Sequence, residues 1–241
     1  MPGGNVLSPR KPTLAKTYQA GSVLKLNRWT LDMDAYYVHF QNGYQTYIDP
    51  GSLEPVFVAT GPSNTKGVEA EGNVALGYGL SVYGNISVGS AKYQKGSNYP
   101  NGGQWVANTP GNVEGLSLLW QHRNWNVALI YKRVGQYHND NGSLNYKING
   151  IIIPYPVDQA IVISPFQLVN VFVSYTIKNS SRLRGTKIQL AVNNLADSHN
   201  IVGVTPAVAA TSAAPFVANP GDLLNLPPGR SITLTITGGY A

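Results

Sequence analysis

Long segments of this chain alternate between apolar and polar residues with a period of two, and no other feature of the sequence constrains the fold as strongly. In the segment 29–39, for example, Leu31 and Met33 alternate with Asp32 and Asp34. Successive side chains of a β-strand point to opposite faces, so each such segment predicts a strand with one apolar and one polar face. The pattern predicts about nine strands. They lie near residues 14–26, 29–39, 68–76, 80–88, 116–121, 125–132, 169–175, 188–193 and 232–237.

The predicted strands are unusually long. The longest of them span about 9–13 residues, whereas the strands of globular proteins average about 5–6. A tilted strand that crosses a bilayer needs about 9–11 residues. Aromatic residues near the strand ends on the apolar faces favour the interfacial girdles of a membrane barrel, although strands favour aromatic residues in general. These residues are Trp29, Tyr37, Trp120, Trp125, Tyr131 and Tyr175.

The connections between the predicted strands alternate in length. An up-and-down meander with short turns at one end and long loops at the other produces this order, which is the layout of outer-membrane barrels. The sequence therefore predicts an all-β, antiparallel, up-and-down transmembrane β-barrel. The short connections are 26–28, 77–79 and 122–124, an intermediate one is 178–185, and the long ones are 41–63, 91–111, 135–164 and 197–228.

A soluble β-sandwich that binds glycans is the alternative from another structural class. Its strands also alternate, but they are usually shorter, and its loops are not sorted by length onto opposite ends. The apolar residues form the core of a sandwich and face hydrocarbon in a membrane barrel. For the barrel, we expect Val82, Ile86, Val127, Leu129, Val171, Leu190 and Leu234 to face lipid, and Asn85, Asn126, Asn170, Gln189 and Thr235 to face inward.

The composition supports an all-β chain and excludes several classes of site. Charged residues make up 12% of the 241 residues and 15 are Tyr, whereas a disordered chain is charged and poor in aromatic residues. The absence of cysteine excludes disulfides, thiolate metal sites and cysteine nucleophiles. The net charge of +6 comes from scattered Lys and Arg residues, so we expect no nucleic-acid partner. The densest basic group, at 178–187, is interpreted as a solvated turn or as a rim beside anionic lipid headgroups.

Four short segments resemble the C-terminal barrel of the TonB-dependent receptors. Residues 66–69 (Lys-Gly-Val-Glu) resemble the opening of a strand that follows a long outer loop in that family. Residues 192–197 (Val-Asn-Asn-Leu-Ala-Asp) are similar to the Asn-Leu-Phe-Asp segment that ends the penultimate strand. Residues 228–230 (Pro-Gly-Arg) precede a segment that resembles the final strand, and residues 11–13 (Lys-Pro-Thr) resemble the opening of a mid-barrel strand.

The resemblance implies a barrel of 22 strands around a plugged lumen. With about nine strands, residues 1–241 would be the C-terminal part of that barrel, the plug domain would be absent, and the chain would be a fragment or one part of a larger assembly. The sequence departs from the family pattern at Ala196, which replaces Phe, at Thr13, which replaces an acidic residue, and at Ala241, which replaces a terminal aromatic residue.

The resemblance also implies a function. The family takes up scarce nutrients across the outer membrane with coupled energy, and the implied cargo is an iron–siderophore complex, cobalamin or a glycan. The implied partners are outer-membrane lipid and lipopolysaccharide, the missing plug and remaining barrel strands, and the TonB complex through an absent N-terminal region. Neither a cofactor nor an enzymatic activity is implied.

We find no arrangement of residues in the sequence that predicts catalysis or metal binding. The four histidines, at positions 39, 122, 138 and 199, lack metal-ligand spacing, and the carboxylate pairs at 32/34 and 69/71 are interpreted as the lining of a wet lumen. We therefore expect no catalytic, cofactor-binding or metal residues. Aromatic residues in the long connections can contact a ligand or pack within the loops. With one histidine among them, these candidates are Tyr44, Tyr47, Tyr93, Tyr99, Trp105, Tyr137, His138, Tyr146 and Tyr155.

Overall fold

The described part of the chain is all-β, as the alternation predicts. A computed structural model describes residues 11–48, 55–95, 102–139, 142–148, 151–157, 161–178, 185–205, 218 and 220–238, with the backbone alone at 45–48, 55–60, 142–148 and 151–157. Within these ranges every regular element is a strand. None of these residues belongs to a helix of the length and apolarity that a membrane span requires.

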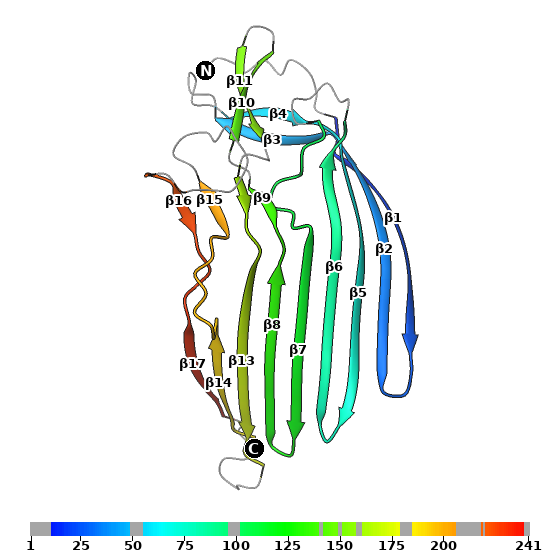
Figure 1. Ribbon diagram of the computed structural model, residues 1–241, viewed down its shortest axis with the longest axis vertical. Coiled ribbons are helices and arrows are strands. Elements are labelled where there is room, and N and C mark those ends of the chain that lie inside the picture. The colour runs from blue at the N-terminus through cyan, green and yellow to red at the C-terminus, as the bar shows by residue number, and fades with distance from the viewer. Residues whose placement is uncertain are drawn as a thin grey trace.

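Nine strands form one antiparallel sheet (Figure 1). Each strand pairs with the long strands that precede and follow it in the chain, so the sheet is an up-and-down meander and the predicted strand number is confirmed. The order across the sheet is β1 (Leu14–Lys25), β2 (Trp29–Gln41), β5 (Ser63–Gly77), β6 (Leu80–Tyr93), β7 (Asn112–His122), β8 (Trp125–Val134), β13 (Phe166–Thr176), β14 (Lys187–Asn193) and β17 (Ser231–Thr237).

The two ends of the sheet differ, as the connection lengths predict. The short connections lie at the lower end in Figure 1, and the long connections lie at the upper end. Three of the four long connections, 41–63, 135–164 and 197–228, are more ordered than the sequence alone indicates. They contain strands that pair into two-stranded ribbons, and β-branched and aromatic residues in them favour extended backbone. The ribbons are β3 (Gly43–Ile48) with β4 (Pro55–Thr60), β9 (Tyr137–Asn139) with β12 (Ile161–Ile163), β10 (Gly142–Ile148) with β11 (Ile151–Val157), and β15 (Gly203–Thr205) with β16 (Leu223–Asn225).

The register gathers the apolar side chains on one face of the sheet. Val82 pairs with Leu118, Leu118 with Leu129, and Leu129 with Val171, so these residues lie in one row. We call this side the apolar face. The opposite side, with Asn85, Asn126 and Gln189 among its residues, is the polar face.

The apolar face is exposed. Ile86 is 44% exposed and Leu234 is 64% exposed, while the buried hydrophobic cluster consists of four residues at the upper end of the sheet. In the described part of the chain no second long sheet covers either face, so the sandwich alternative is wrong. A sandwich would have buried these side chains between its two sheets. The buried cluster is Tyr137, Ile161, Ile163 and Val204.

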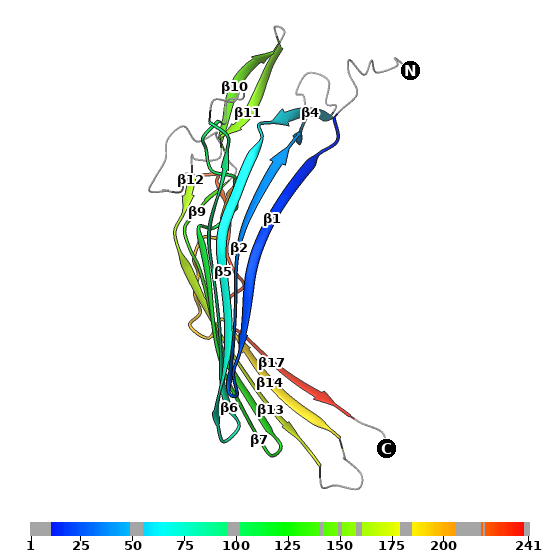
Figure 2. The same ribbon diagram turned by 90° about the vertical axis from the view of Figure 1, so that its right-hand side faces the viewer.

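In the described part of the chain, the sheet is a curved wall with two free edges. β1 and β17 are the outermost strands and do not pair with each other. Figure 2 shows that the sheet curves and twists strongly between them. This is the partial barrel that the strand number predicts, because the described strands cover only part of a closed barrel.

The connection that leads to the last strand is organised by Asn194, which is 4% exposed and has a φ of 50°. Its backbone N–H donates to Asn170 Oδ1 over 2.9 Å, and its side-chain amide donates to the carbonyls of Ser198 and Pro228, each over 3.0 Å. Asn194 Oδ1 accepts the N–H of Ser198. Asparagine adopts the left-handed region more readily than other non-glycine residues, which explains the residue type at this position.

Candidate functional site

Four carboxylates meet on the polar face near the middle of β2 and β5. Asp32 pairs with Glu71 in the register, and Asp34 pairs with Glu69. Together with neighbours on β6 they line a cavity of about 430 Å³. The two aspartates and two glutamates predicted to line a lumen therefore lie on one face, as neighbours across two strands.

Two carboxylates of the acidic cluster accept hydrogen bonds from side chains on β6. The hydroxyl of Tyr83 donates to Glu71 Oε2 over 2.7 Å, and the hydroxyl of Ser87 donates to Glu69 Oε1 over 2.9 Å. Asp34 Oδ1 is buried and accepts no hydrogen bond in the described part of the chain. Carboxylates that face each other across strands repel, so this cluster favours a cationic partner on the polar face.

The histidines do not assemble into a metal centre. No three His, Asp or Glu residues of the described ranges are arranged to hold a metal ion. His39 bonds Asn64 Oδ1 through Nδ1 over 2.7 Å, and His122 stacks on Trp120 with ring centroids 5.9 Å apart. His199 lies 3.9 Å from Asp197, far along the chain from the other two.

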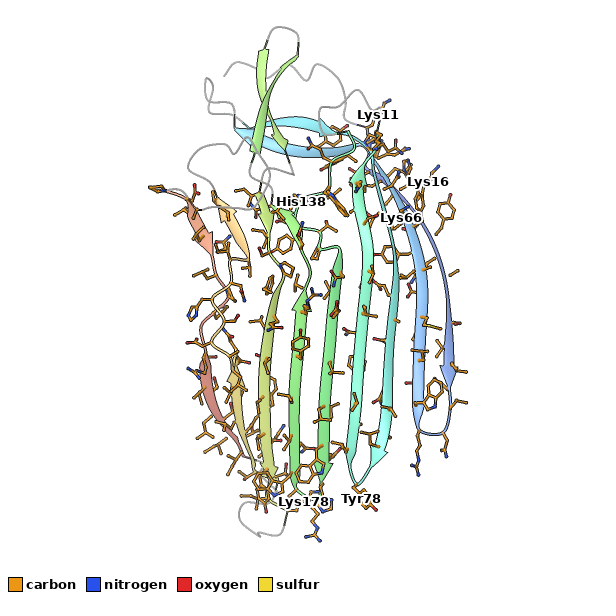
Figure 3. The ribbon with its side chains drawn as sticks, viewed as in Figure 1. Lys11, Lys16, Lys66, Tyr78, His138 and Lys178 are labelled. Carbon is orange, nitrogen blue, oxygen red and sulfur yellow. The ribbon has the colours of Figure 1, made fainter. Side chains whose placement is uncertain are left out.

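Two of the predicted ligand-contacting residues come together at the upper end of the sheet. Trp105 and His138 stack with ring centroids 5.8 Å apart, and the ammonium of Lys92 lies 4.4 Å from the centroid of the Trp105 ring. Figure 3 shows His138 at the junction between the sheet and the long connections. Burial lowers the pKa of His138, and the nearby charge of Lys92 lowers it further.

Tyr137 lies apart from that stack although it is the neighbour of His138. It is buried in the hydrophobic cluster, and its hydroxyl donates to the carbonyl of Val202. Burial raises the pKa of the Tyr137 hydroxyl. Its surroundings are those of a packing residue that anchors the connection after β14 to the ribbon formed by β9 and β12.

The other predicted contact residues are spread over the upper end. Tyr44, on β3, donates its hydroxyl to the carbonyl of Lys11 over 3.4 Å, and Tyr93 ends β6. Tyr99 lies outside the described residues. The backbones of the remaining three candidates are placed on ribbons: Tyr47 on β3, Tyr146 on β10 and Tyr155 on β11. Of the nine predicted residues, the described structure thus brings Trp105 and His138 together as a pair. The ligand-contacting role of all nine stays a prediction.

A group of three lysines was not predicted from the sequence. Lys66, Lys92 and Lys95 line a groove of about 420 Å³ at the upper end of β5 and β6. Residues 66 and 92 have the same strand parity as the apolar residues Val68 and Val88, so the alternation could have placed them on the apolar side. Their separation in sequence hid their proximity, because the register between β5 and β6 was needed to bring them together.

Aromatic pairs flank the apolar face at both ends. Trp125 and Tyr175 are register partners with ring centroids 4.8 Å apart, near the short connections. Tyr18 and Tyr37 pair at the other end, with ring centroids 6.4 Å apart. The two pairs therefore lie towards opposite ends of the sheet.

Comparison with known proteins points to one family. A sequence profile described as "TonB dependent receptor-like, beta-barrel" matches residues 1–195. No curated protein matches the sequence of the chain.

Solved structures share the fold. The ferric-catecholate import receptor Fiu from E. coli K12 has a TM-score of 0.62 at 16% identity, with 94% of this chain and 27% of that chain covered. The ferric yersiniabactin uptake receptor FyuA from Yersinia pestis has a TM-score of 0.64 at 16% identity, with 92% and 29% covered. The copper transporter OprC has a TM-score of 0.66 at 14% identity, with 98% and 34% covered. The chain thus spans about a third of the length of these proteins, and the likeness shows the fold.

Proposed function

Because this chain belongs to the TonB-dependent receptor-like β-barrel family, we propose that it forms part of the wall of an outer-membrane receptor for energy-coupled nutrient uptake. The observation that carries this proposal is the exposed apolar face, with residues such as Ile86, Leu129 and Leu234. Water disfavours so large a contiguous apolar surface, whereas the hydrocarbon of a bilayer favours it. The apolar face then contacts lipid and the polar face lines the lumen.

Residues 1–241 form the C-terminal part of the barrel in this proposal, and the plug lies outside them. The cluster of Asp32, Asp34, Glu69 and Glu71 supports a plug partner, because carboxylates that face a lumen pair with basic side chains on whatever fills it. The TonB complex would act through the part of the receptor that carries the plug. Further strands of the same barrel would pair with the free edges of β1 and β17.

The proposed cargo is a metal chelate, with an iron–siderophore complex as the first candidate before cobalamin or a glycan. Fiu and FyuA are receptors for ferric chelates by name, which supports this order. The aromatic residues at the upper end, Trp105 and His138 among them, are the proposed contacts of the loops with the cargo. The chain acts as a receptor wall and not as an enzyme.

Two measurements test this proposal. The protein should sediment with outer membranes and require detergent, rather than salt or carbonate, for release. Cells that make an intact receptor containing this chain should accumulate a ferric chelate, and cells that make residues 1–241 alone should not. A protein recovered from the soluble extract, or uptake by the chain alone, contradicts the proposal.

A further inference from the structure

Two of the long connections, 91–111 and 135–164, meet at the upper end of the sheet. Residues 103–108 of the first connection contact both β6 and β9, and we call them the bridging segment. The backbone N–H of Asn108 donates to the carbonyl of His138, on β9, over 2.7 Å. This hydrogen bond and the side chains around it join two connections that lie far apart in the sequence.

The bridging segment is attached to β6 through its backbone. Trp105 pairs with Lys92 as an antiparallel bridge. The N–H of Val106 donates to the carbonyl of Ala91 over 3.0 Å. These backbone contacts do not involve β9, so the bridging segment can stay attached to β6 while its contact with β9 changes.

The side-chain part of the contact with β9 is a stack of two rings. The rings of Trp105 and His138 have centroids 5.8 Å apart and an interplanar angle of 20°. β9 itself is held firmly, because the side-chain amide of Asn139 donates to the carbonyl of Val204 and Asn139 Oδ1 accepts the N–H of Val204 over 3.3 Å. His138 is therefore a fixed support on which Trp105 rests.

This arrangement disfavours a charged His138. Burial lowers the pKa of His138, and so does the ammonium of Lys92, which lies 4.4 Å from the centroid of the Trp105 ring. His138 Nδ1 is buried and has no hydrogen-bond partner in the described part of the chain. In the neutral tautomer with its proton on Nε2, protonation of Nδ1 would create a buried donor without an acceptor, which is costly.

Among the described residues, Lys92 is the charged group that acts on His138. The bridging segment and β12 contain no titratable side chain. Tyr137, the neighbour of His138 on β9, points to the other side of the strand, and its hydroxyl donates to the carbonyl of Val202. The carboxylate of Glu114 already binds Arg133 Nη1 over 2.9 Å.

We propose that the stack of Trp105 on His138 is a pH-sensitive latch, which holds the bridging segment on the ribbon of β9 and β12 at neutral pH and releases it in acid. When the latch opens, the His138 ring gains water and loses its proximity to Lys92, so the open form binds a proton more readily than the closed form. The open form should therefore gain population as the pH falls from 6.5, the ordinary pKa of histidine, through the lower pKa of the closed form.

The latch would also control access to an aromatic ring. In the closed form described here the Trp105 ring is half-buried, with His138 stacked on it. In the proposed receptor this ring is a contact for the cargo, so acid would free it for binding. This consequence rests on the proposed function, whereas the latch itself does not.

Fluorine NMR of the intact protein, with a fluorinated tryptophan at position 105 alone, tests the latch. The difference in the resonance between ordinary and heavy water reports the exposure of the ring to solvent, and it should grow as the pH falls from about 7.5 to about 5. In His138→Gln, which cannot take up the proton, this response should be lost. The matched control is His122→Gln, which removes the histidine stacked on Trp120 and should leave the response at position 105 unchanged.

A second variant tests the role of the lysine. Lys92→Gln should diminish the pH response, because removal of the ammonium narrows the difference in proton affinity between the closed and open forms. Lys132→Gln, which removes the same charge from the polar face, should not. This pair decides the question even if His138→Gln does not fold.

Three results would overturn the latch: an exposure at position 105 that does not change with pH, an equal response in His138→Gln, and an undiminished response in Lys92→Gln. Failure of the proposed function is distinguishable, because the protein would then be soluble without detergent. The fluorine signal reports the latch in either case.

Discussion

At the scale of single residues, a tightly packed site on the polar face joins Tyr36 to two glycines. Tyr36 pairs with Gly67, which pairs with Gly89. A Cβ on Gly67 would lie 2.7 Å from Tyr36 Oη and 2.7 Å from the carbonyl oxygen of Val88. The aromatic ring therefore occupies the space that the missing side chains leave, and any larger residue at position 67 must displace both the ring and a neighbouring strand.

We expect Gly67→Ala to destabilise the protein by about 1–3 kcal/mol, because overpacking forces side chains and backbone to shift. Denaturant unfolding from detergent micelles measures this change. Gly84→Ala is the control, since the nearest atom to its Cβ, the carbonyl oxygen of Gly115, is 3.7 Å away and ordinary contact results. Equal stability of the two variants would show that Tyr36 does not hold the position that we describe.

The pKa of His138 reports on a second local arrangement, the stack of Lys92, Trp105 and His138. Burial depresses this pKa first and the charge of Lys92 second, so Lys92→Gln should raise it towards the ordinary histidine value without restoring it fully. A titration of the His138 ring by NMR measures the shift, and Lys132→Gln on the polar face should leave it unchanged. A His138 pKa that does not move in Lys92→Gln would contradict the stacked arrangement of Lys92, Trp105 and His138.

The sign of the pH effect follows from the same shift. A folded pKa below the unfolded value means that the unfolded chain binds the proton more readily. The ribbon of β9 and β12 should therefore lose stability as the pH falls from 6.5, the ordinary pKa of histidine, through the lower folded pKa of His138. Above that window the contribution of His138 to stability should be constant.

At the scale of elements, the connection between β14 and β17 depends on one buried amide. Asn194→Ala removes two donated bonds, to Ser198 and Pro228, and one accepted bond, and it places alanine at a φ of 50°. We expect a loss of about 2–4 kcal/mol. The side-chain amide of Asn193 donates an exposed hydrogen bond to Ser231 Oγ. The variant Asn193→Ala should therefore lower the free energy of unfolding by less than about 1 kcal/mol. Similar costs for the two variants in denaturant unfolding would contradict the organising role of Asn194.

Among the elements, the long strands could be predicted from the sequence and the short ribbons could not. Alternation placed the nine long strands because side-chain direction repeats every two residues whatever the neighbours are. It could not place the ribbons, such as β3 with β4, because short strands in long connections depend on pairing partners rather than on a buried face. The ends of the sheet were predictable from connection lengths, and the order of pairing followed from the short turns.

The candidate sites also differ in how far the sequence could predict them: a site within one strand was predictable, and a site that needs contacts between distant residues was not. The carboxylates on β2 and β5 were predictable because each pair shares a strand, and their alignment across strands needed only one register. The groove lined by Lys66, Lys92 and Lys95 required the register between β5 and β6 and the approach of residue 103, which lies in the connection that follows β6. The burial of Tyr137 depends on Val204, which follows it by more than sixty residues, and no local pattern reports such a contact.

At the scale of the whole molecule, the proposed function requires the apolar face of the sheet to meet lipid. The sheet is a curved wall whose apolar side chains are exposed, and the buried hydrophobic cluster of the described residues, at its upper end, has four members. In the proposed receptor, hydrocarbon around the apolar face and a filled lumen on the polar face would supply the surroundings that the sheet itself lacks.

The most direct test is a scan with single cysteines, which is clean because the sequence contains no cysteine. Spin-labelled cysteines at Ile86 and Val127, on the apolar face, are compared with labels at their chain neighbours Asn85 and Asn126, on the polar face. In the intact receptor in a bilayer, we predict that a lipid-soluble relaxing agent broadens the spectra at Ile86 and Val127 and leaves those at Asn85 and Asn126 unaffected. Access of the lipid-soluble agent to Asn85 and Asn126, with Ile86 and Val127 shielded, would contradict the account.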